Sequence, residues 1–136
     1  MEITTKQTVL IIDDDQSEVM LTKMVLSEIE PEIGVDAAYS GEDGLALLRS
    51  GRPLPALTLL DLKIPRLSGI DVLHLIRADE RLKHLPVIIV TNSKLESDRQ
   101  KSIEAGADDY LHKAFDIEFF SRDIKSLLQR YLLKTG

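Results

Sequence analysis

Cysteine is absent from this chain of 136 residues, so the chain forms no disulfide bond and offers no thiolate to a metal site. The N-terminus also lacks the basic start and the apolar stretch of a signal peptide. Apolar runs are short, and none approaches the roughly 18 residues that a membrane-spanning helix needs. These absences lead us to expect a cytoplasmic protein that does not associate with membranes.

Positive charge is scarce as well, because 17 lysines and arginines stand against 23 aspartates and glutamates and leave a formal net charge of −6. Proteins that bind DNA through phosphate contacts normally carry a basic face, so we expect no direct DNA binding. Hydrophobic residues make up 43% of the chain, which is enough to form a core. The length fits one compact domain, which we expect to span residues 1–136 with a core at about 8–133.

Five short apolar runs recur along the chain, at 9–12, 35–38, 56–60, 87–90 and 110–111. Apolar residues at successive positions are typical of parallel strands that helices cover on both faces. The segments between the runs have helical spacing, and Ser40, Ser68 and Ser93 stand where helix N-caps are expected. Gly106 suits the left-handed position that follows a helix. This alternation predicts a doubly wound α/β domain.

Polar residues stand at the ends of four of the five predicted strands. They are Asp13, Asp14 and Asp15 after the first strand, Asp61 after the third, Thr91 at the end of the fourth and Lys113 at the end of the fifth. Parallel strands point the same way, so their carboxyl ends share one edge, where open α/β sheets bind their ligands. We therefore expect these side chains to form one pocket.

The residue types in this predicted pocket indicate phosphoryl transfer. Clustered carboxylates repel one another unless a hard cation neutralises them, and Mg²⁺ prefers oxygen ligands. A carboxylate such as that of Asp61 can act as a nucleophile and form an aspartyl-phosphate. An ammonium group and a hydroxyl group then compensate the charge of the phosphoryl oxygens. Each residue alone has a plainer role, such as helix capping for Asp15, and only the whole set favours this chemistry.

In this order the motifs resemble those of the receiver domains of two-component response regulators. The resemblance covers 9–131 and rests on four stretches: LIIDDD at 10–15, LLDLKIP at 59–65 with SG at 68–69, PVIIVT at 86–91, and AGADDY at 105–110 leading to Lys113. It implies a flavodoxin-like fold, with a five-stranded parallel sheet of order 2-1-3-4-5 and five helices. It also implies a phosphorelay module that receives its phosphoryl group from a histidine kinase or a phosphotransfer protein and catalyses only the phosphorylation and dephosphorylation of its own aspartate.

The resemblance also implies a role for individual residues. Asp61 matches the phosphoacceptor, and Thr91 and Lys113 match the pair that contacts the phosphoryl group. Tyr110 matches an aromatic switch whose rotamer is coupled to that of Thr91. The implied Mg²⁺ ligands are Asp13, Asp14, Asp61 and the backbone carbonyl of Lys63.

The chain departs from the family pattern in two places. Most relatives have a proline after the lysine, joined by a cis bond, whereas Ala114 follows Lys113 here. A cis bond before alanine costs about 3–4 kcal/mol, so we expect a trans bond or a strained cis bond, and a loop of altered shape. In a common dimer of DNA-binding relatives, Asp109 would pair with an arginine where Asp123 stands, and Phe119 replaces a glutamate. That type of dimer is not expected.

The last two predicted helices offer a route for output. The helix at about 94–105 is expected to be mobile because it has few apolar anchors, namely Leu95, Ile103 and Ala105. The helix at about 116–133 has an apolar stripe of Ile117, Phe120, Ile124, Leu127, Leu128, Tyr131 and Leu132. Phe119 falls outside that stripe. We expect these helices and the strand between them to bind a downstream protein or to form a homodimer.

Three alternatives to a phosphorylated receiver fit the sequence less well. A phosphatase with an aspartate nucleophile typically has a second aspartate two residues on, where Lys63 stands. A nucleotide-binding protein would need a P-loop or a glycine-rich dinucleotide motif, and the sequence has neither. A degenerate receiver would lack part of the polar set.

The chain ends soon after its last predicted helix, so we expect a stand-alone regulator without an output domain. The Ile-Pro after Asp61, the run 91–94 and the missing proline resemble regulators paired with bacterial phytochrome kinases.

Overall fold

The computed structural model describes residues 7–113 and 116–132. Within them, five parallel strands form one sheet of order β2-β1-β3-β4-β5, as the family resemblance implied. The strands are β1 (Thr8–Ile12), β2 (Gly34–Ala38), β3 (Leu57–Leu60), β4 (Val87–Thr91) and β5 (Asp109–His112). The helices are α1 (Gln16–Ile29), α2 (Gly41–Leu48), α3 (Gly69–Ala78), α4 (Glu96–Glu104) and α5 (Ile117–Tyr131). The predicted α/β fold is confirmed.

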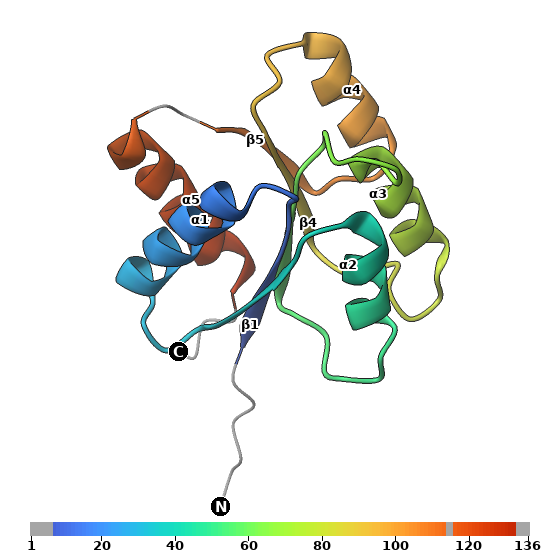
Figure 1. Cartoon of the computed structure of the whole chain (residues 1–136), viewed down its shortest axis with the longest axis horizontal. Helices are drawn as coiled ribbons and strands as arrows, with labels where there is room; N and C mark the ends of the chain where they lie inside the picture. The colour runs from blue at the N-terminus through green and yellow to red at the C-terminus, as the bar shows by residue number, and fades with distance from the viewer. Residues whose placement is uncertain (1–6, 114–115, 133–136) are drawn as a thin grey trace, which may run out of the picture.

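Helices cover both faces of the sheet, with α1 and α5 on one side and α2, α3 and α4 on the other (Figure 1). Successive residues of a strand point to opposite faces, and both faces are apolar. Leu10 and Ile12 of β1 belong to the buried cluster under α2 and α3. Val9 and Ile11 belong to the buried cluster under α1 and α5. This two-sided burial explains why the strands were visible as continuous apolar runs.

Strand pairing brings the polar strand ends to one edge. β1 and β3 are neighbours in parallel register, with Ile12 opposite Leu60, so Asp13 and Asp61 follow adjacent strands. The Asp61 N–H donates to the carbonyl of Ile12 at 2.9 Å, which fixes the backbone of Asp61. The Lys113 N–H donates to the carbonyl of Thr91 at 2.8 Å at the end of β5. The strand pairing thus places the backbones of Asp13, Asp61, Thr91 and Lys113 at one edge of the sheet, as the sequence predicted.

Side chains cap the helices that begin at this edge. Asp15 accepts hydrogen bonds from the backbone N–H groups of Ser17 (2.9 Å) and Glu18 (3.2 Å), so it is the N-cap of α1. Ser40 caps α2 and Ser68 caps α3, as predicted. The reciprocal capping box is found at Ser68 with Asp71, a position where the sequence predicted only a cap. These caps set where α1 and α3 start relative to the strand ends that precede them.

The prediction that Ser93 caps α4 is wrong. The N-cap is Leu95, which has no capping side chain, and α4 begins at Glu96. The Ser93 hydroxyl instead donates to the carboxylate of Asp98, and it accepts a hydrogen bond from the N–H of Leu95 at 3.3 Å. Ser93 thus lies before the helix and joins its first turn through a side chain rather than through the usual capping contact.

The predicted apolar anchors of α4 are also wrong in part. Leu95 is 61% exposed and Ile103 is 45% exposed, while Asp98 and Ser102 are buried. Ala105 packs against the cluster under α2 and α3, as predicted. We infer that α4 is held mainly by polar contacts, because Ile103 and the N-cap Leu95 are exposed while Asp98 and Ser102 are buried.

Two further expectations about the last helices have a mixed outcome. Gly106 has a φ of 104° directly after α4, which confirms its left-handed position. On α5, Phe119 is 51% exposed as predicted, but Ile117 is 44% exposed and does not belong to the buried stripe. The buried residues of α5 are Phe120, Ile124, Leu127 and Leu128.

The Lys113–Ala114 bond and the loop after it lie outside the described residues. Among residues 7–113 and 116–132, no helix has both the length and the apolar character needed to span a bilayer.

Candidate functional site

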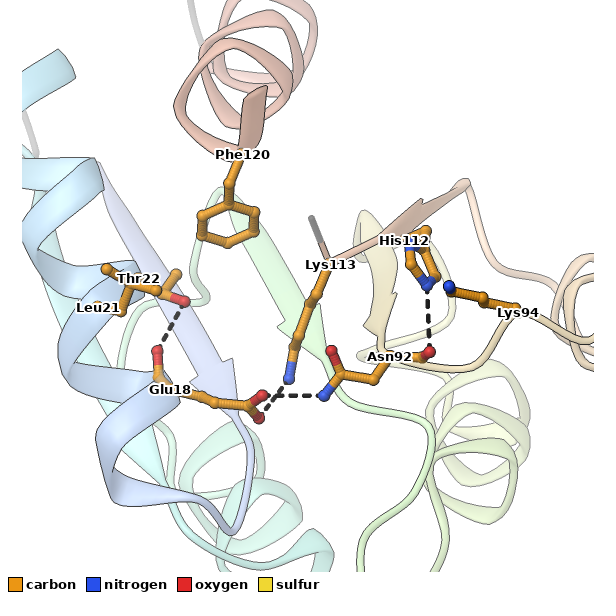
Figure 2. Close-up of a pocket in the computed structure, with 8 residues that line it drawn as sticks. All are labelled: Glu18, Leu21, Thr22, Asn92, Lys94, His112, Lys113 and Phe120. Carbon is orange, nitrogen blue, oxygen red and sulfur yellow. Dashed lines mark hydrogen bonds and ion pairs between the residues drawn. The ribbon is translucent and has the colours of Figure 1, made fainter. Parts of the chain in front are cut away.

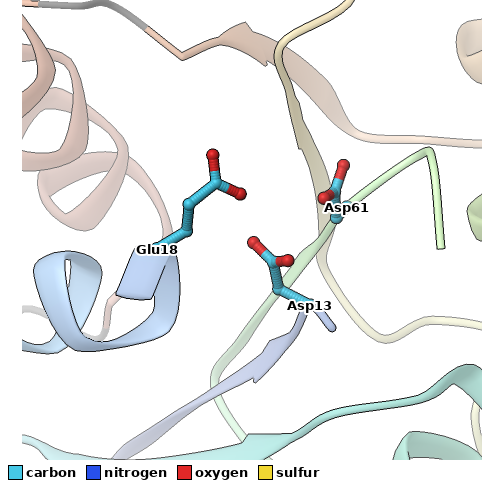
Figure 3. A group of neighbouring side chains, drawn as sticks. All are labelled: Asp13, Glu18 and Asp61. Atoms are coloured by element: carbon cyan, nitrogen blue, oxygen red, sulfur yellow. The ribbon is translucent and has the colours of Figure 1, made fainter. Parts of the chain in front are cut away.

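Three carboxylates meet at the carboxyl edge of the sheet (Figure 3). Asp13 follows β1, Glu18 lies in the first turn of α1, and Asp61 follows β3. One oxygen from each residue lies within 4.8 Å of the other two. Asp13 and Asp61 are only 4% and 8% exposed. Burial of several acids at such short range is unfavourable unless positive charge compensates them.

Lys113 supplies part of that compensation. Its Nζ donates to Glu18 at 2.7 Å, to Asp13 at 2.9 Å and more loosely to Asp61 at 3.4 Å. Burial alone would lower the pKa of Lys113, but the hydrogen bond to Glu18 and the charges of Asp61 and Asp13 outweigh it and raise the pKa. The lysine is therefore charged at neutral pH, and one ammonium group faces three carboxylates.

The remaining negative charge and the all-oxygen donor set match a hard divalent cation. All three possible metal ligands in this group are carboxylates and none is a histidine. This donor set suits Mg²⁺ better than the transition metals that prefer imidazole ligands. The fit between donor chemistry and Mg²⁺ thus holds for the described residues.

Asp61 has an unusual protonation equilibrium. Its burial, reinforced by the negative charge of Asp13, raises its pKa from 3.8 to about 6 even though Lys113 opposes the shift. The N–H of Lys63 donates to Asp61 Oδ1 at 3.3 Å, which also favours the charged form. At neutral pH the Asp61 carboxyl group is ionised in most molecules, although its burial disfavours the charged form.

This strain gives a first prediction, on stability. In metal-free buffer at about pH 7.5, Asp61→Asn is expected to raise the free energy of unfolding by about 1–2 kcal/mol, because it removes a buried carboxylate but keeps its shape. Since the folded-state pKa lies above the unfolded-state value, the penalty develops as the pH rises from about 4 to about 6 and is complete above that.

Chemical denaturation of both proteins at about pH 7.5 and about pH 4.5 measures this gain. The gain should shrink at the lower pH. A loss of stability at pH 7.5, or a gain of equal size at both pH values, would contradict the burial argument.

The other predicted site residues have distinct environments. Thr91 is fully buried at the end of β4, and its Oγ1 accepts the N–H of Ser93 at 3.2 Å. Asp14 is exposed and lies outside the group of clustered carboxylates. The ammonium group of Lys63 pairs with the carboxylate of Asp98 on α4 at 3.3 Å.

The loops after β3 and β4 are joined at α4. Asp98 is the common partner, because it accepts the hydroxyl of Ser93 and pairs with Lys63. The Tyr110 hydroxyl donates to the backbone carbonyl of Ser93 at 3.3 Å. Burial and the nearby charge of Asp98 raise the pKa of Tyr110, so its hydroxyl stays protonated and acts as the donor. Tyr110 and Thr91 are thus both hydrogen-bonded to Ser93, in the loop after β4.

Glu18 is the site residue that the sequence reasoning missed. In sequence it is one of several polar residues in the first turn of a helix, and the spacing of strand ends does not include it. Its contact with Lys113 joins positions 95 residues apart. Only the direction in which α1 leaves the sheet, fixed by the Asp15 cap, brings it to the pocket.

A family model described as the response regulator receiver domain matches residues 9–125. The chain belongs to this family. A receiver domain is a phosphorelay module whose partner is a kinase or a phosphotransfer protein. Its strand order and its acidic pocket agree with this membership.

Curated relatives of this receiver include longer regulators. The chain is 35% identical over 123 residues to the probable transcriptional regulatory protein TcrX of Mycobacterium tuberculosis, covering 90% of this chain and 50% of TcrX. It is also 35% identical to the DNA-binding regulator RpaA of Synechocystis, covering 90% of this chain and 49% of RpaA. The receiver thus spans about half the length of these relatives.

Two solved structures of response regulators have the same fold as this chain over nearly their full length. The phosphorylated cyanobacterial phytochrome response regulator RcpA superposes with a TM-score of 0.87 at 23% identity, over 97% of this chain and 98% of RcpA, a likeness of fold. The Mn²⁺-bound response regulator Rcp1 gives a TM-score of 0.82 at 26% identity, over 96% of both chains.

Proposed function

We propose that this receiver accepts a phosphoryl group on Asp61, in a Mg²⁺-dependent reaction, from a histidine kinase or a phosphotransfer protein. The observation that carries the proposal is the buried Asp61 carboxylate, which lies beside Asp13 and within reach of the Lys113 ammonium group. Its neighbours give it the charge environment that an aspartyl nucleophile needs.

Transfer of the phosphoryl group from the donor to Asp61 forms one bond to phosphorus and breaks one. One Oδ atom of Asp61 forms a bond to the phosphorus of the donor while the bond from phosphorus to the leaving atom breaks. The leaving atom, a histidine nitrogen in a protein donor, keeps the bonding electrons and takes up a proton. In later hydrolysis, water oxygen bonds to phosphorus, the phosphorus–Oδ bond breaks, and the electron pair returns to the carboxylate. The receiver catalyses both steps only on its own side chain.

The residues proposed to hold Mg²⁺ are Asp13, Asp14, Asp61 and the backbone carbonyl of Lys63. When bound, the ion supplies positive charge that offsets the carboxylates and the phosphoryl oxygens. The Mn²⁺-bound form of Rcp1 supports a divalent-ion site in a similar fold. Asp14, being exposed, suits contact through a water molecule.

The proposed switch uses the contacts behind the pocket. After phosphorylation, the Thr91 hydroxyl would move to donate to a phosphoryl oxygen and would give up the N–H of Ser93 that it accepts in this structure. Lys113 would donate to another phosphoryl oxygen. Tyr110 would then turn inward into the space that Thr91 vacates and would release the backbone carbonyl of Ser93. Since α4 is held mainly by polar contacts through Asp98, a change at this loop is able to shift it.

The surface of α4, β5 and α5 is the proposed output face, for a downstream protein or a homodimer. Phe119 contributes exposed apolar area there, and Asp109 already pairs with Arg130 of its own chain, so it is engaged without a second copy. A phytochrome-type kinase is the proposed donor, since the bacteriophytochrome response regulator RtBRR has a similar fold at 29% identity. The net charge of −6 favours protein rather than DNA as the partner, and a cytoplasmic site of action fits this scheme.

Incubation with acetyl phosphate and Mg²⁺, followed by intact-mass measurement, tests the proposal. We expect an adduct of one phosphoryl group, present with Mg²⁺ and absent with excess EDTA. Lys113→Ala should reduce the steady-state adduct by at least about tenfold, since it removes the cation nearest to Asp61. An adduct that forms equally well in EDTA would contradict the metal-dependent scheme, and no adduct with any donor would favour a degenerate receiver.

A further inference from the structure

Glu18 makes the shortest contact in the pocket. Its Oε2 accepts the Lys113 ammonium at 2.7 Å, and its Oε1 accepts the amide of Asn92 at 2.9 Å (Figure 2). Asn92 follows β4 directly. Both oxygens are thus engaged, one by β5 and one by the loop after β4. These hydrogen bonds lower the pKa of Glu18 against the opposing effect of its burial, so the residue is a carboxylate at neutral pH.

The Lys113 ammonium has three N–H donors, and the structure directs them at three carboxylates. The contact with Asp61 is the loosest of the three, so a tight bond to a phosphoryl oxygen on Asp61 would draw the ammonium group away from its closer partners, Asp13 and Glu18. Asp13 is buried and belongs to the proposed metal side of the pocket. Glu18, with 27% of its side chain exposed, is the partner that can turn away into solvent at least cost.

The space for that movement is present. Glu18 and Lys113 line a pocket of about 380 Å³ together with Leu21, Thr22, Asn92, Lys94, His112 and Phe120. The pocket lies between α1, α5 and the ends of β4 and β5 (Figure 2). A glutamate that leaves Lys113 has room to move into this pocket without disturbing the buried clusters.

We propose that Glu18 is a positioning residue that restrains Lys113 in the unphosphorylated receiver and competes with the phosphoryl group for it. This inference rests on the proposed function of Asp61. Two effects act in the same direction. Glu18 occupies the lysine that the phosphoryl group needs, and its negative charge repels the incoming phosphoryl oxygens. Glu18 therefore favours the unphosphorylated form, and Asn92 strengthens this bias by holding Glu18 in place.

Binding of beryllofluoride, a noncovalent phosphoryl analogue, tests this role when it is followed by calorimetry in the presence of Mg²⁺. Glu18→Gln is expected to bind beryllofluoride about three- to tenfold more tightly than wild type, the size expected for one partly screened charge a few ångströms away. Asn92→Ala keeps the charge but frees the glutamate, and should tighten binding by about twofold. Because both act through one contact, the double variant should match Glu18→Gln rather than add to it.

A purely structural tie between α1 and β5 gives a different result. In that case Glu18→Gln lowers the melting temperature and leaves beryllofluoride affinity unchanged or weaker, which overturns the inference. Glu28→Gln, the same substitution on the exposed side of α1, controls for net charge and should change nothing. Glu18→Asp keeps the charge and should stay close to wild type. If wild type itself binds no beryllofluoride, the proposed function fails, and that outcome is distinct from a normal wild type with an indifferent Glu18→Gln.

Discussion

Replacing Asp61 by asparagine is expected to abolish phosphoryl acceptance. The amide has neither the charge nor the nucleophilic oxygen of a carboxylate, so the step that forms the phosphorus–oxygen bond is lost. The other polar groups of the pocket, including Lys113 and Asp13, stay in place. After incubation with acetyl phosphate and Mg²⁺, intact-mass measurement should show at least about a hundredfold less adduct than wild type, a loss typical of a missing nucleophile.

The stability of Asp61→Asn and a matched control variant separate loss of the nucleophile from loss of the fold. Asp61→Asn is expected to be more stable than wild type, so a loss of adduct is not a consequence of unfolding. Asp43→Asn, on the exposed side of α2, makes the same chemical change away from the pocket and should leave the adduct at the wild-type level. An adduct of undiminished amount in Asp61→Asn would mean that another residue accepts the phosphoryl group.

Gly69→Ala is expected to cause the second large effect, a loss of about 2–4 kcal/mol in the free energy of unfolding. A Cβ atom on Gly69 would clash with the backbone carbonyl of Asp61 and lie 2.7 Å from Cα of Leu62. Both neighbours are backbone atoms, which cannot move aside alone. The N–H of Gly69 also donates to the carbonyl of Leu62 at 3.0 Å, so the start of α3 is tied to this loop.

The clash would displace the loop that holds the Asp61 side chain, and phosphorylation should fall along with stability. Gly44→Ala is the matched control, because the three atoms nearest to its new Cβ would all belong to the side chain of Ile12, the closest at 2.5 Å. A side chain can shift, and alanine favours the helix interior, so the expected loss there is smaller, about 1–2 kcal/mol. Urea denaturation measures both variants. Equal losses, or a Gly69→Ala protein as stable as wild type, would contradict the proposed close approach.

Much of the fold was predictable because the sheet is buried on both faces. The residues 87–90 of β4 are apolar without interruption, and all are buried, so the strand was visible from local composition alone. The grouping of Asp13, Asp61 and Lys113 was predictable for a related reason. Parallel strands place every carboxyl end at one edge, so sequence position after a strand was enough to bring these side chains together.

Contacts between polar side chains of distant elements were not predictable in this way. Glu18 reaches Lys113 only because α1 leaves β1 in a particular direction, and no local pattern encodes that direction. The same holds for Asp98, a charged residue of α4 that is buried against Ser93 and Lys63. Hydrophobic periodicity pointed to Leu95 and Ile103 as anchors, since it ranks residues by polarity and cannot foresee that polar contacts hold this helix.

Some expectations stay predictions. The metal roles of Asp14 and of the Lys63 carbonyl, and the action of this receiver without an output domain, belong to this group. The bond before Ala114 lies outside the described residues.

Chemical trapping of the phosphorylated residue shows directly whether Asp61 is the phosphoacceptor. Wild-type protein is phosphorylated with acetyl phosphate and Mg²⁺, reduced with borohydride, which converts an aspartyl-phosphate to homoserine, and digested for tandem mass spectrometry. We expect homoserine at position 61 and at no other acidic residue. Homoserine at Asp13 or Asp14, or a reduced glutamyl product at Glu18, with Asp61 intact, would contradict it.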